Sequence, residues 1–318
     1  MSVFDKLIPF LQSRLKESGE FILVGKERIP IRKDAFFELK EESAKKVVFV
    51  DGGNAEFLSG PNVSLQFARF YAGVWENNVR VRRELQECVI ASIMQKKGND
   101  VNFEVTVFSM EGGELRKYDV DIFDSRVSFG KRRAEPYAVG NLVRKKLEIE
   151  FAAELAKNLG KGDILVRDGE LDVDIEETSS LLEASKNISL LSISKTCRLC
   201  TDSGSSALFV LEKLAPSGSW LYFAGANVAF AKLHENAKHI FRVDVQNVES
   251  LNSLPSLLEN SKDPAFLGYP YGLMDADKFA QVTKDEISQF KVRFALKSKE
   301  LFGSLERALS AHDVLNRF

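Results

Sequence analysis

The sequence predicts a mixed α/β fold in which one sheet is flanked by helices, and two observations lead to this prediction. Short apolar runs alternate along the chain with segments whose apolar residues recur at helical spacing. Two of the runs, residues 47–50 and 164–166, are continuously apolar, as expected for central strands covered on both faces. The hydrophobic content of 44% and the charged content of 28% are typical of a globular protein.

The first half of the chain predicts a helix, three strands and a second helix. Leu7, Phe10, Leu11 and Leu15 lie at helical spacing, so an amphipathic helix precedes the core and either docks on its own domain or contacts a partner. The strands then predicted form an antiparallel meander, at residues 47–51, 64–76 and 102–110. A polar insertion over residues 112–133 separates them from a long helix, from about 137 to 159.

The second half predicts alternating strands and helices. The strands expected are 163–168, 188–195, two within 220–230 and 239–245, with helices at 175–185 and 205–214 and a mostly helical end. Three strands followed by alternating helices and strands is the order of ribonuclease H-like folds, although a fold says little about activity. We expect a single domain with three parts: an N-terminal helical extension over residues 1–45, a core with insertions over 46–290, and a C-terminal helical tail over 291–318.

Composition sets only broad limits on function. Three cysteines cannot build a disulfide framework and suit a reducing cytosol. No signal pattern and no run of 18 apolar residues occurs, so we expect a cytoplasmic protein that does not enter a membrane. The net charge of -2 is uninformative about nucleic acid, because a basic groove is compatible with a neutral total.

Two aspartates, Asp51 and Asp168, each end an apolar strand and precede a glycine. Open α/β sheets bind ligands at the carboxyl ends of their strands, so the two carboxylates are expected to converge if the strands are neighbours. Unpaired carboxylates repel each other, and a divalent cation is their natural companion. We expect the glycines to leave room for a phosphate. The alternative for each aspartate is that it begins a turn.

Further carboxylates accompany this pair. Glu148 lies on the apolar face of the long helix, where a carboxylate is costly unless a metal ion or a buried Arg or Lys pairs with it. Asp275 and Asp277 lie near the start of a late helix, Asp275 as a candidate N-cap and Asp277 as a candidate fourth metal ligand. Three or four carboxylates around two divalent ions is an arrangement used for phosphodiester hydrolysis.

Basic residues occur in two clusters that would suit a phosphate backbone. Runs of charge are more often only solvated surface, so each residue alone is a weak candidate. The candidates for DNA binding are Arg80, Arg82, Lys131, Arg132, Arg133 and Arg144.

Five segments in order resemble the NurA nucleases: "VFVDGGNAEFL", the helix with Glu148, "ILVRDGEL", "SISKTCRL" and "GYPYGLMDADKFA". They span about residues 47–280. The resemblance implies a ribonuclease H-like fold, a homodimer, and 5′–3′ exonuclease and single-strand endonuclease activity on DNA with Mn²⁺, or Mg²⁺, as cofactor. It also implies a partner, the hexameric HerA translocase, and a role in end resection at double-strand breaks.

By position, the resemblance implies that Asp51, Glu148 and Asp168 are metal ligands, with Glu150 a neighbouring alternative for the helix ligand. Lys195 would be an active-site cation, and Tyr269 would lie beside the scissile phosphate. The chain departs from the family at two positions. Gly53 stands where the family usually has serine, and Asp277 stands where members commonly carry histidine.

Two other classes of function remain open. A sugar-kinase or actin-like ATPase also ends its first strand in an Asp-Gly-Gly loop that binds phosphates. That class wants Ser or Thr just beyond the glycines, whereas this loop continues Asn-Ala-Glu, and no late glycine-rich adenosine motif is evident. The second class is a non-catalytic DNA-repair adaptor with the same fold.

Overall fold

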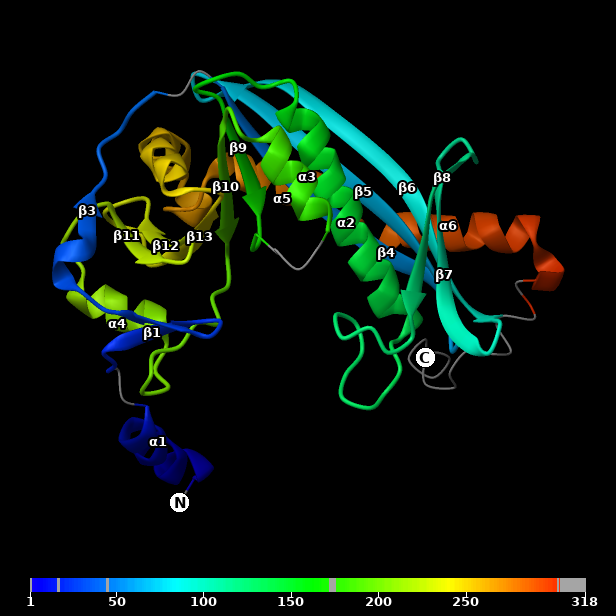
Figure 1. The fold of residues 1–318 in the computed structure, drawn as a ribbon, viewed down its shortest axis with the longest axis horizontal. Coiled ribbons are helices and arrows are strands. Elements are labelled where there is room, and N and C mark those ends of the chain that lie inside the picture. Colours follow the sequence, from blue (N-terminus) through cyan, green and yellow to red (C-terminus); the bar gives the residue numbers. More distant parts are fainter. Residues whose placement is uncertain (1, 16–17, 44–45, 172–175, 302, 304–318) are drawn as a thin grey trace.

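The computed structural model describes residues 2–15, 18–43, 46–171, 176–301 and 303, and its centre is one large twisted sheet (Figure 1). Five consecutive strands form an antiparallel meander: β4 (Val47–Gly60), β5 (Val63–Glu76), β6 (Val79–Lys97), β7 (Asp100–Ser109) and β8 (Glu114–Asp121). On the other side of β4, strand β9 (Ile164–Asp168) pairs in parallel with β4, and β10 (Ser189–Ser194) pairs in parallel with β9.

The order β6-β5-β4-β9-β10 confirms the predicted ribonuclease H-like class. Three antiparallel strands come first in the chain, and two parallel strands are then added beside the first of them. Parallel pairing requires crossover connections, and helices supply them. The sheet continues past β10 through four antiparallel strands: β13 (Phe241–Val245), β12 (Val228–Lys232), β11 (Trp220–Gly225) and β3 (Phe36–Glu38).

Helices cover both faces of the central strands (Figure 1). On one face, α2 (Pro136–Ala156) and α3 (Glu177–Ala184) pack on a core that includes Val48 and Val50. On the other face, α5 (Tyr271–Ala280) packs on a core that includes Val47 and Phe49. Successive side chains of a strand point to opposite faces, which explains why this run is continuously apolar.

Smaller elements complete the fold around this centre. Helix α4 (Ala207–Leu214) packs against β11 and β12, and α6 (Lys284–Lys297) packs Ile287, Phe290 and Phe294 on the far end of β4 and β5. The remaining elements are the hairpin β1 (Phe21–Val24) and β2 (Glu27–Pro30), and four 3₁₀ segments: η1 (Lys33–Ala35), η2 (Val248–Leu257), η3 (Glu259–Ser261) and η4 (Pro264–Phe266).

Two strands of the meander were not predicted. The first half of β6 is exposed and rich in charge, so its sequence resembles a basic surface segment more than a strand. Strand β8 lies within the predicted polar insertion and is mostly exposed because it pairs at the edge of the sheet. Alternation of apolar and polar residues weakens where neither face of a strand is covered, and the first half of β6 and most of β8 lack that signal.

The terminal segments differ in how far they match expectation. Helix α1 (Val3–Arg14) forms as predicted but has no buried residue, so the expected docking on its own domain is not seen. The N-terminal segment also contributes β3 to the main sheet. Part of the predicted C-terminal helical tail, residues 304–318, lies outside the described residues. Among the described helices, none combines the length and apolar character needed to span a membrane.

Candidate metal centre

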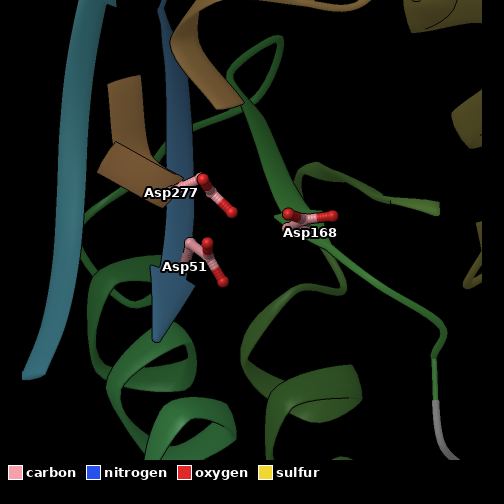
Figure 2. Close-up of side chains that lie close together, drawn as sticks. All are labelled: Asp51, Asp168 and Asp277. Carbon is pink, nitrogen blue, oxygen red and sulfur yellow. The ribbon is translucent and has the colours of Figure 1, made fainter. Parts of the chain in front are cut away.

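Three aspartates meet where the parallel pairing of β4 with β9 ends, at the carboxyl end of β9 and within β4 (Figure 2). Val50 pairs with Arg167, so the next residues, Asp51 on β4 and Asp168 on β9, lie side by side at the same edge. Asp277 reaches the same place from α5, which packs across that face. One carboxylate oxygen from each residue lies within 4.8 Å of the other two, so the three could together hold a metal ion.

Electrostatics in this cluster reflect burial and mutual repulsion. Burial raises the pKa of Asp51 to about 8, and the charges of Glu148, Asp168 and Asp277 add to the rise. The Gly52 backbone N–H donates to Asp51 at 2.8 Å, and no described cationic side chain is paired with this carboxylate. Burial also raises the pKa of Asp168, although Lys195 and Tyr269 oppose that rise. Asp277 is the exposed member, with 55% of its side chain accessible.

Lys195 bridges two members of the cluster. It follows β10 directly, and its Nζ lies 2.6 Å from Asp168 Oδ2 and 2.7 Å from Asp277 Oδ1. Burial alone would lower the pKa of Lys195, but the two carboxylates outweigh burial and raise it, so the side chain is a fixed positive charge. The sequence-predicted cation therefore lies among the predicted ligands.

Tyr269 lies behind Asp168 and is fully buried. Its hydroxyl donates to Asp168 Oδ1 at 3.1 Å. Burial, with the charge of Asp168, raises the pKa of Tyr269 far above its usual range, so the hydroxyl remains a neutral donor. Lys195 Nζ and Tyr269 OH thus occupy different oxygens of one carboxylate and set its orientation.

The donor set fits a hard divalent cation. Mg²⁺ and Mn²⁺ prefer carboxylate oxygens, and all three donors here are carboxylates. Burial is the main cause of the raised pKa of Asp51, and the neighbouring carboxylates of Glu148, Asp168 and Asp277 add to it. A cation bound between the three side chains would offset the negative charge of the cluster.

Glu148 lies near this cluster but is paired with two arginines. Its Oε1 accepts from Arg167 Nη2 at 2.7 Å, and its Oε2 accepts from Arg144 Nη1. Its side chain is 5% exposed and comes from α2, on the opposite face of the sheet from α5. These contacts match the buried-arginine alternative for Glu148, and its role as a metal ligand stays a prediction. Glu150, the neighbouring candidate, is paired with Arg116.

The glycines after Asp51 do not leave room for a phosphate as predicted. A Cβ at Gly52 would lie 2.8 Å from Glu148 Oε2 and 2.9 Å from the Phe70 ring. A Cβ at Gly53 would lie 3.0 Å from the carbonyl carbon of Ala280 and closer still to its oxygen. Side chains and the end of α5 therefore fill the space. The φ of +95° at Gly169 is a separate reason for glycine.

Several of the predicted DNA-binding arginines are engaged within the protein. Arg80 pairs with Asp275, Arg82 with Glu84, and Arg144 with Glu148. Arg133 donates to the Pro61 carbonyl at 2.9 Å. Lys131 and Arg132 are exposed and form no ion pair within the described part of the chain.

The N-cap prediction for Asp275 was wrong. Helix α5 begins at Tyr271 with Pro270 as its N-cap, so Asp275 lies inside the helix, where it is buried. The glycine at the second position of α5, Gly272, lies so close to the Phe49 ring that a Cβ would overlap it, a tertiary contact that the sequence does not reveal.

Two arginines near the centre were missed. Arg167 precedes Asp168 within the apolar strand and is buried beside Glu148. Arg242 on β13 pairs with Asp244 and Glu170. Asp244 also accepts from the Leu171 N–H at 2.9 Å, so these side chains connect the loop after Asp168 to β13. A charged residue inside an otherwise apolar strand, as in "ILVRD", is the signal that could have revealed Arg167.

No protein-family model matches the chain, and no curated protein matches it. Among solved structures, human endonuclease V is 13% identical with a TM-score of 0.35, and the match covers 81% of this chain and 94% of that one. Endonuclease V of Ciona intestinalis, solved with a 23mer DNA, is 9% identical with a TM-score of 0.35, covering 91% and 100%.

A. aeolicus Argonaute is 13% identical with a TM-score of 0.34, over 75% of this chain. The chain spans only 28% of the length of that Argonaute. The strand order and the site are observed directly in this chain. A ribonuclease H-like sheet carries three aspartates, one lysine and one buried tyrosine where the parallel pairing of β4 with β9 ends.

Proposed function

We propose that this protein is a divalent-cation-dependent nuclease that hydrolyses DNA phosphodiester bonds. The observation that carries the proposal is the meeting of Asp51, Asp168 and Asp277 within 4.8 Å, beside the last parallel pair of β4 and β9. A cluster of carboxylates with one cationic neighbour suits a cation and a phosphate together, because the cation neutralises both.

Each side chain has a distinct role in this proposal. Asp51, Asp168 and Asp277 would hold one or two Mn²⁺ or Mg²⁺ ions, which when bound would stabilise the negative charge that develops on the phosphate oxygens. Lys195, one-third exposed, offers its ammonium group to the same charge, and the neutral Tyr269 hydroxyl keeps Asp168 oriented. Glu148 could join the ligands only by leaving at least one of its two arginines.

The finer assignment rests on the five ordered segments that resemble NurA nucleases. It comprises 5′–3′ exonuclease and single-strand endonuclease activity, a homodimer, a HerA-type hexameric ATPase as partner, and a cytoplasmic role in double-strand break end resection. All five segments contribute to the central sheet or to the helices on it, which supports a common origin for the site.

One assay tests the proposed function. End-labelled single-stranded and duplex DNA is incubated with Mn²⁺, Mg²⁺ or EDTA, and ATP hydrolysis is measured in parallel. Cleavage that needs the cation and is abolished by Asp51→Asn is expected. Asp34→Asn, which changes an exposed aspartate paired with Arg32, is the matched control and should cleave normally.

Two results would contradict the proposal and favour the alternatives. ATP hydrolysis without DNA cleavage would indicate a kinase-like or actin-like ATPase. DNA binding without cleavage under all cation conditions would indicate a non-catalytic adaptor.

A further inference from the structure

Helix α5 supplies Asp277, and an ion pair of the buried Asp275 with the one-third exposed Arg80 joins this helix to the sheet. Arg80 Nη1 lies 2.7 Å from Asp275 Oδ1 and 2.6 Å from Asp275 Oδ2. The Tyr71 hydroxyl on β5 also donates to Asp275 Oδ2, at 3.0 Å. The Asp275 side chain is 8% exposed, so both strands contact α5 through one desolvated carboxylate.

Arg80 also contacts α5 on the far side of Asp277. Its guanidinium lies 5.3 Å from the centre of the Phe279 ring, and that ring stacks on Tyr71 at 5.0 Å. Residues 275 and 279 are one turn apart on the same helix face, with Asp277 between them on the opposite side. Arg80 therefore contacts both ends of the helical turn that carries Asp277.

The hairpin that carries Arg80 holds the start of α5 as well. Asn78, at the tip between β5 and β6, accepts from Asn260 Nδ2 at 2.6 Å. Asn260 Oδ1 in turn accepts from the Gly272 N–H at 2.7 Å. A Cβ at Gly272 would overlap the Phe49 ring, so α5 lies directly on β4 at this point and has little freedom to move.

We propose that Arg80 and Asp275 are positioning residues, which hold α5 at the rotation that brings Asp277 to Lys195, Asp51 and Asp168. A buried ion pair adds little net stability compared with apolar residues, but its geometry specifies one arrangement of the helix. This role replaces DNA binding as the assignment for Arg80. The effect of this positioning on DNA cleavage rests on the proposed nuclease function. Its effect on the contact between Asp277 and Lys195 does not.

The first test is a double-mutant cycle on Asp275→Asn and Asp277→Asn, with Mn²⁺ alone as the titrant and DNA cleavage rate as a second readout. Asp275→Asn is expected to lower Mn²⁺ affinity about 10- to 100-fold, the usual effect of losing a group that orients metal ligands. If Asp275 acts through Asp277, the double variant should be no weaker than Asp277→Asn alone. Fully additive losses would overturn the proposal.

A matched control separates positioning from general stability. Lys146 and Glu177 form an ion pair between α2 and α3 on the other face of the sheet, with both side chains largely buried. Glu177→Gln should lower thermal stability as Asp275→Asn does but leave Mn²⁺ affinity unchanged. An equal loss of affinity in both variants would overturn the proposal.

The second test needs neither metal nor DNA. The acetylation rate of Lys195, followed by mass spectrometry in the metal-free protein, reports whether Asp277 still contacts the ammonium group. Asp277→Asn sets the rate for a lost contact, and Asp275→Asn and Arg80→Met should approach it, with Arg80→Lys between them and the parent protein. An unchanged rate in Arg80→Met and Asp275→Asn would refute the positioning role.

The same variants discriminate the two proposals. If Arg80 instead binds DNA, Arg80→Met should raise the KM for DNA and leave Mn²⁺ affinity and Lys195 acetylation unchanged, which would overturn positioning. If the parent protein cleaves no DNA but Lys195 acetylation is faster in Asp275→Asn and Arg80→Met, the nuclease proposal fails and the positioning role stands. Arg80 is one-third exposed, so Arg80→Met is the variant to use if Asp275→Asn does not fold.

Discussion

Replacing Gly53 with alanine should destabilise the protein and disturb the metal centre together. The added Cβ would lie 3.0 Å from the carbonyl carbon of Ala280 and closer still to its oxygen, and real Cβ atoms essentially never come that close to an oxygen. Both partners are backbone, in β4 and at the end of α5, so neither can turn aside as a flexible side chain would. Relief requires α5 to move away from the sheet, and overpacking of this kind costs about 1–3 kcal/mol.

Urea unfolding and Mn²⁺ titration of the same samples measure the two effects. The free energy of unfolding should fall by about 1–3 kcal/mol, and Mn²⁺ affinity should fall because Asp277 lies one turn before Ala280. Gly113→Ala is the matched control, since its Cβ would meet only Ser109 Oγ at 3.5 Å and its φ is not positive. A Gly53→Ala variant as stable as the control, with unchanged Mn²⁺ affinity, would refute the close contact between α5 and β4.

Three further predictions follow from the charges around the centre. Because the folded-state pKa of Asp51, about 8, exceeds its usual value near 4, the folded metal-free protein binds more protons between those pH values. Its unfolding free energy in urea should therefore fall as pH rises from about 4 to 8, and Asp51→Asn should remove most of that dependence; a rise with pH would contradict the assignment. Arg167→Met should cost about 3 kcal/mol in chemical denaturation by leaving Glu148 under-compensated, and adding Glu148→Gln should recover part of the loss; no recovery would show that the two side chains are not coupled. Replacing both Lys131 and Arg132 with alanine should reduce the slope of log affinity for DNA against log salt by about 1 to 2; an unchanged slope would exclude them from the phosphate contacts.

Much of the central fold could be predicted because burial leaves a strong pattern in the sequence. The run at residues 47–50 is apolar at every position, since one half of it faces α2 and the other half faces α5. The long helix was predicted from about 137 to 159 and is observed as Pro136–Ala156 for the same reason. Strands β6 and β8 were missed where both faces are exposed, because solvent imposes no alternation on a paired strand.

The candidate site divides along the same line. The amino-acid sequence alone shows that Asp51 and Asp168 each follow the apolar run of a central strand, because the run and the acid are adjacent along the chain. The prediction that Asp51 ends its strand was wrong, because β4 continues past it to Gly60, paired with β5. Which distant residues meet the two aspartates depends on the packing of the whole chain. Parallel pairing of β4 with β9 brings the two carboxylates together, and packing of α5 adds Asp277. The folded chain also pairs Glu148 with Arg144 and Arg167 and fills the space beside Gly52 and Gly53. These contacts depend on how helices pack against a sheet, so they leave no local pattern in the sequence.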